Sequence, residues 1–154
     1  MGALIVGTSG FSYDDWVGRV YPPDTPKTKM LEHYPARLRG LELNYTYYRM
    51  PTARTMESLA ARAGSRLRFA VKLTDLFTHK RTATEGDVAA FREAMIPLDE
   101  GGTLGCLLAQ FPYAFGASKG NLRYLQAVLD AFRPLPVVVE LRNARWLHPG
   151  LLSF

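Results

Sequence analysis

The sequence predicts an α/β protein: a parallel β/α barrel of which these 154 residues supply the first five βα units. Apolar segments of strand length alternate with segments of helical periodicity, which is typical of parallel sheets. Polar residues lie near the end of these strands and point to one face, while their apolar neighbours point to the other. Glu42 and Asn44 share a face in this way, and so do Glu140 and Arg142. Because parallel barrels gather the carboxyl ends of their strands at one mouth, we expect one shared site there.

Five strands are expected, each bounded by Gly, Pro or polar residues. They cover residues 3–8, 41–45, 67–73, 104–110 and 137–142. A long aromatic loop follows the first strand, and the loop LFTHKRTAT follows the third. The connections between consecutive strands are long enough to hold helices, so we expect right-handed parallel crossovers.

Helices are expected between the strands. They begin near Lys27, after Thr52, after Thr84, after Ser118 and within residues 145–154. The three hydroxyl residues before the second, third and fourth helices are predicted N-caps, and Asp87 completes a capping box with Thr84. Gly64 ends the second helix and Pro35 ends or kinks the first.

Composition narrows the class of protein. An apolar fraction of 47% and a charged fraction of 21% exclude a disordered chain. No apolar run reaches the roughly 18 residues of a membrane span. Cys106 is the single cysteine and cannot form an internal disulfide, so we expect a cytoplasmic protein with an inert thiol. The net charge of +5 favours phosphate-bearing partners, although the basic residues are scattered.

Five strands are too few for a closed barrel, which takes eight strands and about 250 residues. We therefore expect residues 1–154 to form a single domain that is the N-terminal part of an incomplete barrel. The remainder is disordered, removed or supplied by another chain. The rival fold is an open doubly wound sheet, but helices on both faces would bury Glu42, Lys72, Glu140 and Arg142 at high cost.

Successive motifs resemble those of the domain-of-unknown-function 72 family (DUF72, YecE-like). These motifs are IVGTSGFSYDDWVGRVYPP, LELNYTYYRMP, LRFAVKLTDLFTHKR, LLAQFPYAF and VVVELRNARW. The resemblance implies a TIM-barrel-like fold in a bacterial or archaeal cytoplasmic protein, and brings no activity. A suggested relation of that family to endonuclease-IV-type barrels implies DNA binding or phosphodiester chemistry. Family members usually continue through three more strands, which are missing here.

The candidate site contains charged and amide side chains from four strand ends. They are Glu42, Asn44, Lys72, Gln110, Glu140 and Arg142. The two carboxylates can serve as general acid and base, and Lys72 can stabilise an anion or act as an amine nucleophile. Arg142 offers a bidentate fork for phosphate or carboxylate. The alternative is a charge-balanced ion network that fixes the register of the barrel.

Loop residues extend the candidate site. His79 follows the third strand and is placed to contact a phosphate. Tyr13 and Trp16 follow the first strand and can stack on a ligand or pack as a lid over the mouth. No HxH, HExxH or paired-cysteine pattern is present, so no metal is assigned and the cofactor is unknown.

We therefore hypothesise an enzyme-like barrel that binds a small anionic or phosphorylated ligand. Two alternatives stay open: a nucleic-acid-binding protein and an inactive, truncated fragment. Whether the chain is an enzyme, and its oligomeric state, do not follow from these residues.

Overall fold

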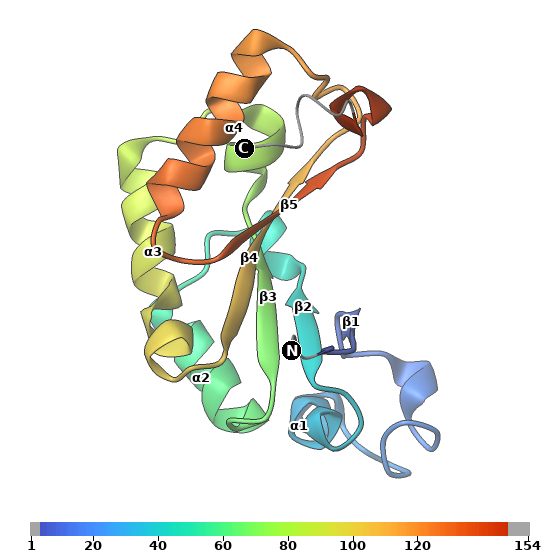
Figure 1. Cartoon of the computed structure of the whole chain (residues 1–154). Coiled ribbons are helices and arrows are strands. Elements are labelled where there is room, and N and C mark those ends of the chain that lie inside the picture. The colour runs from blue at the N-terminus through green and yellow to red at the C-terminus, as the bar shows by residue number, and fades with distance from the viewer. Residues whose placement is uncertain (1–3, 148–154) are drawn as a thin grey trace.

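The computed structural model describes residues 4–147, and its core is a five-stranded parallel sheet in the order β1-β2-β3-β4-β5 (Figure 1). The strands are β1 (Gly7–Ser9), β2 (Gly40–Leu43), β3 (Arg68–Lys72), β4 (Leu104–Phe111) and β5 (Val137–Leu141). The helices are α1 (Lys27–His33), α2 (Ala53–Ala63), α3 (Glu85–Glu100) and α4 (Lys119–Phe132). This alternation confirms the predicted α/β, TIM-barrel-like fold.

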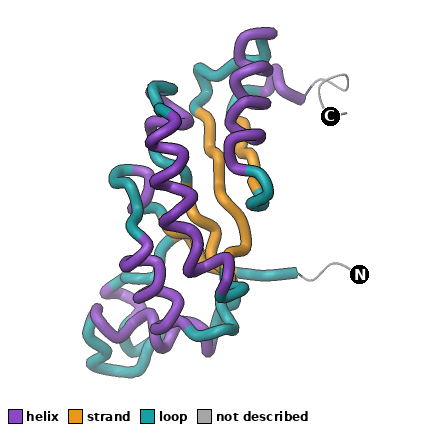
Figure 2. The backbone as a smooth tube through the Cα atoms, turned by 90° about the vertical axis from the view of Figure 1, so that its left-hand side faces the viewer, coloured by secondary structure: helices purple, strands orange, loops and turns teal. Residues whose placement is uncertain are grey.

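The sheet has two unlike faces. Helices α2, α3 and α4 lie along one of them (Figures 1 and 2). Alternate residues of β2 and β3, such as Leu43 and Val71, are buried on that face, while Glu42 and Lys72 on the other face stay partly exposed. Within residues 4–147 no helix covers this second face, which we call the open face, so the doubly wound alternative is wrong.

Aromatic packing joins α3 and α4 to the turn that follows β3. Phe77, Phe91 and Phe132 form a triangle of edge-to-face contacts with ring centroids 5.2–5.9 Å apart. All three side chains are buried. Edge-to-face geometry of this kind adds about 0.5–1.5 kcal/mol per pair beyond area burial. These rings belong to the apolar core on the helix-covered face of the sheet.

Local signals predicted the helix starts correctly. The side-chain oxygens of Thr52, Thr84 and Ser118 each accept a hydrogen bond from a backbone N–H in the first turn of α2, α3 and α4. The Thr84 N–H also donates to Asp87 Oδ2 at 2.7 Å, which completes the capping box. Helix α2 ends before Gly64, whose φ is 68°.

Three predicted segments differ in the structure. The first strand begins at Gly7 and not at residue 3, since Leu4 is 91% exposed and outside the strand. The second ends at Leu43, because Asn44 is helical in backbone and a 3-10 helix (Tyr45–Tyr47) follows. The expected loop after β3 contains a π-helix (Leu76–Lys80).

The expected end of the first helix and the expected fifth helix are each reproduced in part. α1 ends at His33, and Pro35 lies in the 3-10 turn Tyr34–Ala36 that follows it. A 3-10 helix (Ala144–Leu147) stands where a fifth helix was expected to begin. The rest of that expected helix lies outside the described residues.

Gly7 is required by the close approach of β1 and β2. A Cβ at this position would lie 1.9 Å from the Gly40 carbonyl oxygen. No side chain fits at that distance, so glycine here permits the pairing that places Ser9 opposite Glu42.

Candidate functional site

A pocket of about 330 Å³ lies at the carboxyl ends of β2 to β5 and is called the mouth pocket here. Its lining residues are Asn44, Tyr47, Tyr48, Lys72, His79, Gln110 and Arg142. Asn44 and Arg142 directly follow β2 and β5, while Lys72 and Gln110 belong to the ends of β3 and β4. Five residues proposed from sequence thus line one pocket, because parallel strands end at the same edge of the sheet.

Glu140 is bound by two donors beside this pocket. Gln110 Nε2 donates to Glu140 Oε2 at 2.6 Å, and Arg142 Nε donates to Glu140 Oε1 at 3.0 Å. Gln110 and Glu140 are register partners across β4 and β5. The Gln110 hydrogen bond and then the Arg142 contact lower the pKa of Glu140. Glu140 is therefore ionised at neutral pH and can accept a proton but not donate one.

Lys72 points its ammonium toward an aromatic ring and not toward an acid. Its Nζ lies 5.4 Å from the centroid of the Tyr47 ring. Within the described part of the chain, no carboxylate lies within 4.0 Å of this ammonium. The charge of Lys72 is consequently free to meet an anion in the mouth pocket.

His79 contributes a neutral imidazole. Burial, followed by the positive charges of Lys72 and Arg142, lowers its pKa below 6.5. Its Nδ1 lies 3.0 Å from Thr78 Oγ1, and its ring meets that of Tyr47 edge-on at 5.0 Å. When the Thr78 hydroxyl donates to Nδ1, Nε2 carries the proton and can donate to a ligand.

The π-helix after β3 places His79 over the pocket. Lys80, the last residue of the π-helix, forms an ion pair with Asp75, the residue that precedes the π-helix. The distance from Lys80 Nζ to Asp75 Oδ2 is 2.8 Å. Arg81 then takes a left-handed conformation with φ of 57° and ends the turn. Single π turns of this kind are frequent at functional sites.

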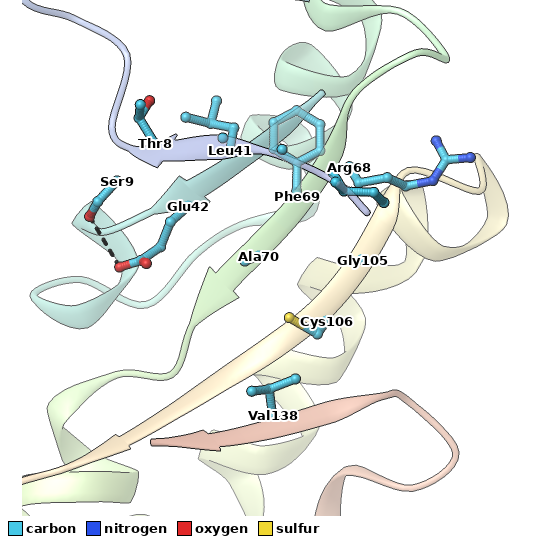
Figure 3. A pocket seen from close by; sticks show the side chains of 13 residues that line it. Thr8, Ser9, Leu41, Glu42, Arg68, Phe69, Ala70, Gly105, Cys106 and Val138 are labelled. Carbon is cyan, nitrogen blue, oxygen red and sulfur yellow. Dashed lines mark hydrogen bonds between the residues drawn. The ribbon is translucent and has the colours of Figure 1, made fainter. Parts of the chain in front are cut away.

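Glu42 lies apart from the other charged residues. It faces a different hollow on the open face, where the Ser9 hydroxyl donates to Glu42 Oε1 at 3.2 Å (Figure 3). Asn44 also bonds Ser9 through its side-chain amide and lines both the mouth pocket and a smaller pocket beside Glu42. Lys72, Gln110 and Arg142 therefore share the mouth pocket as expected, whereas Glu42 lies outside it, and Asn44 lines pockets on both sides.

The two predicted aromatic residues lie on the Glu42 side. Tyr13 lines the smaller pocket beside Glu42, and its hydroxyl donates to the Ser9 carbonyl oxygen. Trp16 packs between Tyr13 and Tyr21, with ring centroids 4.8 and 5.9 Å away. Trp16 therefore supports the loop, and neither ring lines the mouth pocket.

Sequence reasoning did not assign Ser9, Tyr47 or Tyr48 to the site. Ser9 pairs with Glu42 in the register of β1 and β2, so its position at a strand end was the available signal. Tyr47 and Tyr48 enter the pocket because a 3-10 turn after β2 redirects the chain. That turn depends on Thr46 Oγ1, which bonds Leu43 O at 2.9 Å and Lys72 O at 2.6 Å.

Residues 4–147 show neither a metal-binding cluster nor a membrane-spanning helix. They contain no group of three or more His, Cys, Asp or Glu side chains arranged to hold a metal ion. Among these residues, too, no helix is long and apolar enough to cross a membrane. The residues of the mouth pocket offer hydrogen-bond donors and cations, which suit an anion.

The fold and the mouth pocket define a TIM-barrel-like α/β protein whose site lies at the carboxyl ends of parallel strands. A family model described as "Protein of unknown function DUF72" matches residues 5–154, and the chain belongs to this family. The UPF0759 protein YunF of Bacillus subtilis (strain 168) is 28% identical over 152 residues, which are 95% of this chain and 53% of that protein.

Crystal structures of two DUF72 family proteins resemble the fold. The protein from Thermotoga maritima MSB8 is 34% identical with a TM-score of 0.81, and the match covers 96% of this chain and 58% of that one. The protein from Enterococcus faecalis V583 is 28% identical with a TM-score of 0.81, over 97% of this chain and 54% of that one. The chain therefore spans just over half the length of these relatives.

Proposed function

We propose that the mouth pocket binds a small anionic or phosphorylated ligand. The observation that carries this proposal is the meeting of Lys72 and Arg142, from strands that are not neighbours, in one pocket with a neutral imidazole and two amides. Among the described residues one carboxylate, Glu140, pairs with Arg142 and none pairs with Lys72, so the two cations outnumber their carboxylate partner. A phosphate, sulfate or carboxylate group would balance the remaining positive charge.

Each side chain has a role in this proposal. Glu140 holds Arg142 by its Nε, which leaves the terminal guanidinium N–H groups for the ligand. Lys72 supplies a second positive charge, and His79 donates a neutral hydrogen bond. The amides of Asn44 and Gln110 fix the orientation of the ligand.

Acid/base chemistry is the finer part of the proposal. Glu140 is the base in this proposal because it is the carboxylate beside the mouth pocket; its lowered pKa keeps it ionised but also makes it a weak base. Glu42 would reach a reacting group only in a ligand that extends past Asn44 toward β1. The chemistry proposed concerns the mouth pocket of this chain, which spans about half the length of its relatives.

A cytoplasmic location is also part of the proposal, because the one cysteine cannot form an internal disulfide.

Titration with inorganic phosphate tests the proposal. Amide NMR shifts should saturate with phosphate and concentrate at residues that line the mouth pocket, such as Lys72 and His79. The amides of α1, which bears Lys29 on its surface, serve as an internal reference. Shifts that stay linear, or that spread evenly over basic surface residues, would contradict a built anion site.

The nucleic-acid alternative has a separate test. Binding of a single-stranded oligonucleotide should weaken steeply as salt rises, through counterion release. Oligonucleotide binding that is absent at low salt, together with saturable phosphate binding, would remove this alternative and keep the small-ligand proposal.

A further inference from the structure

Glu42 is a carboxylate without a cationic partner in the part of the chain that the structure describes. Among residues 4–147 no nitrogen of Lys, Arg or His lies within 4.0 Å of it. Its one hydrogen bond there comes from the Ser9 hydroxyl, which donates to Oε1 at 3.2 Å (Figure 3). Oε2 has no donor among these residues. Because Glu42 is only partly exposed, an opposite charge beside it would be favourable.

The surroundings of Glu42 suit a positively charged group. The smaller pocket beside Glu42 has a volume of about 230 Å³, and its lining includes the aromatic residues Phe11, Tyr13 and Tyr45. Tyr13 and Tyr45 are 40% and 39% exposed, so part of each side chain is open to a ligand. An ammonium group is attracted by a carboxylate and by the negative face of an aromatic ring. The smaller pocket therefore favours a cation, whereas the mouth pocket favours an anion.

A relay of hydrogen bonds leaves two acceptors available in this region. The Asn44 amide donates through Nδ2 to Ser9 Oγ, and the Ser9 hydroxyl in turn donates to Glu42 Oε1. Since Asn44 uses its amide N–H group in this relay, its Oδ1 is left as an acceptor, and no described residue donates to it. An ammonium has three N–H donors, which Asn44 Oδ1 and Glu42 Oε2 can both accept.

The smaller pocket adjoins the mouth pocket, where Lys72 carries its positive charge. Asn44 lines both pockets. Glu42 is the register partner of Ala70, which lies two residues before Lys72 on the same face of β3. Neighbouring strands are about 4.8 Å apart and two residues span about 6.6 Å, so the Cα atoms of Glu42 and Lys72 are about 8 Å apart. No ion pair joins these two side chains, so one small ligand can meet both charges.

We propose that the ligand of this site is a phosphorylated amine, a small zwitterion. Its phosphate binds Lys72 and Arg142 in the mouth pocket, and its ammonium binds Glu42 and Asn44 in the smaller pocket. This inference rests on the proposed function, because it adds a second charged group to the same anion. The chain has a net charge of +5, which disfavours cations in general. Tighter binding of an amine would therefore report on a local carboxylate and not on non-specific attraction.

Matched pairs of ligands test the inference. Titration calorimetry at constant ionic strength compares aminoethyl with propyl phosphate, and aminobutyl with pentyl phosphate. In each pair a methyl group replaces the ammonium and the phosphate stays the same. At least one amino compound should bind more tightly than its partner by about five-fold or more. Saturable binding of all four compounds without such a gain would overturn the zwitterion and keep the anion site. No binding of any of them would overturn the proposed function as well.

A matched pair of substitutions locates the ammonium. Glu42→Gln keeps the shape of the side chain and an oxygen that accepts from Ser9, so the variant should fold, as a melting curve checks. Its affinity ratio between the amino compound and the methyl analogue should fall to about one. Glu32→Gln is the control, since Glu32 pairs with Lys29 at 3.0 Å on α1 and its loss changes the net charge equally. The control should keep the ratio of the parent chain. A ratio that persists in Glu42→Gln, or that falls equally in both variants, would refute ammonium binding at Glu42.

Discussion

Replacing Lys72 with methionine is the sharpest test of the mouth pocket. Methionine keeps most of the length and the apolar stem of lysine but removes the ammonium. Within the described residues this ammonium contacts the Tyr47 ring and no carboxylate, so no buried charge is left unpaired. The loss of the cation–π contact should lower the free energy of unfolding by about 0.5–1 kcal/mol at most.

The effect on ligand binding should be larger than the effect on stability. A hydrogen bond to a charged group contributes about 1.5–3 kcal/mol. Since about 1.4 kcal/mol corresponds to ten-fold in affinity, Lys72→Met should weaken phosphate binding by about ten- to hundred-fold. Partial exposure of the pocket places the expected value toward the lower end of this range.

Isothermal titration calorimetry with inorganic phosphate at constant ionic strength measures this change. Lys29→Met is the matched control, because Lys29 pairs with Glu32 at 3.0 Å on the surface of α1 and its loss changes the net charge equally. The control should bind phosphate as the parent chain does. Unchanged affinity of Lys72→Met together with a large loss of stability would refute the reasoning and favour a structural ion network.

Three further predictions concern the fold and its pH dependence. The pKa of His79 is lowered in the fold, so as pH falls below 6.5 the unfolded chain binds a proton at His79 before the folded chain does, and the fold loses stability. Between pH 7 and 5.5 the melting temperature of His79→Gln should therefore drop less than that of the parent chain. An equal drop in both would refute this reasoning. Gly7→Ala should lower the free energy of unfolding by about 1–3 kcal/mol through its clash with Gly40, measured by urea denaturation, whereas Gly120→Ala in the open first turn of α4 should not destabilise. Thr84→Ala should cost about 0.5–2 kcal/mol by removing the α3 cap, and a neutral result in the same assay would show that the capping box is dispensable.

Elements governed by near neighbours were predictable from the sequence. Thr52, Thr84 and Ser118 begin helices because a side-chain oxygen reaches the backbone N–H three residues on. The alternation of Leu41, Glu42 and Leu43 indicated which face of β2 is buried. These signals depend on distances along the chain, so the fold class and most helix starts followed from them.

Elements governed by distant contacts were not predictable. The turn that ends β2 and directs Tyr47 into the mouth depends on Thr46 bonding the Lys72 carbonyl, which comes from another strand. The π-helix that carries His79 was missed for another reason: its residues gave no helical period, although the Asp75–Lys80 ion pair spans only five residues. The separate position of Glu42 follows from Ser9, which binds it across the β1–β2 pair.

The amino-acid sequence by itself determined the order of strands and helices and the polar residues near the strand ends, because period and capping are local properties of the chain. Tertiary structure alone decided that Lys72 and Arg142 share a pocket, that Glu140 is held ionised between Gln110 and Arg142, and that Glu42 stands apart. The reason is physical: protonation and contact depend on charges and donors brought close by packing, and packing joins residues that lie far apart in the chain.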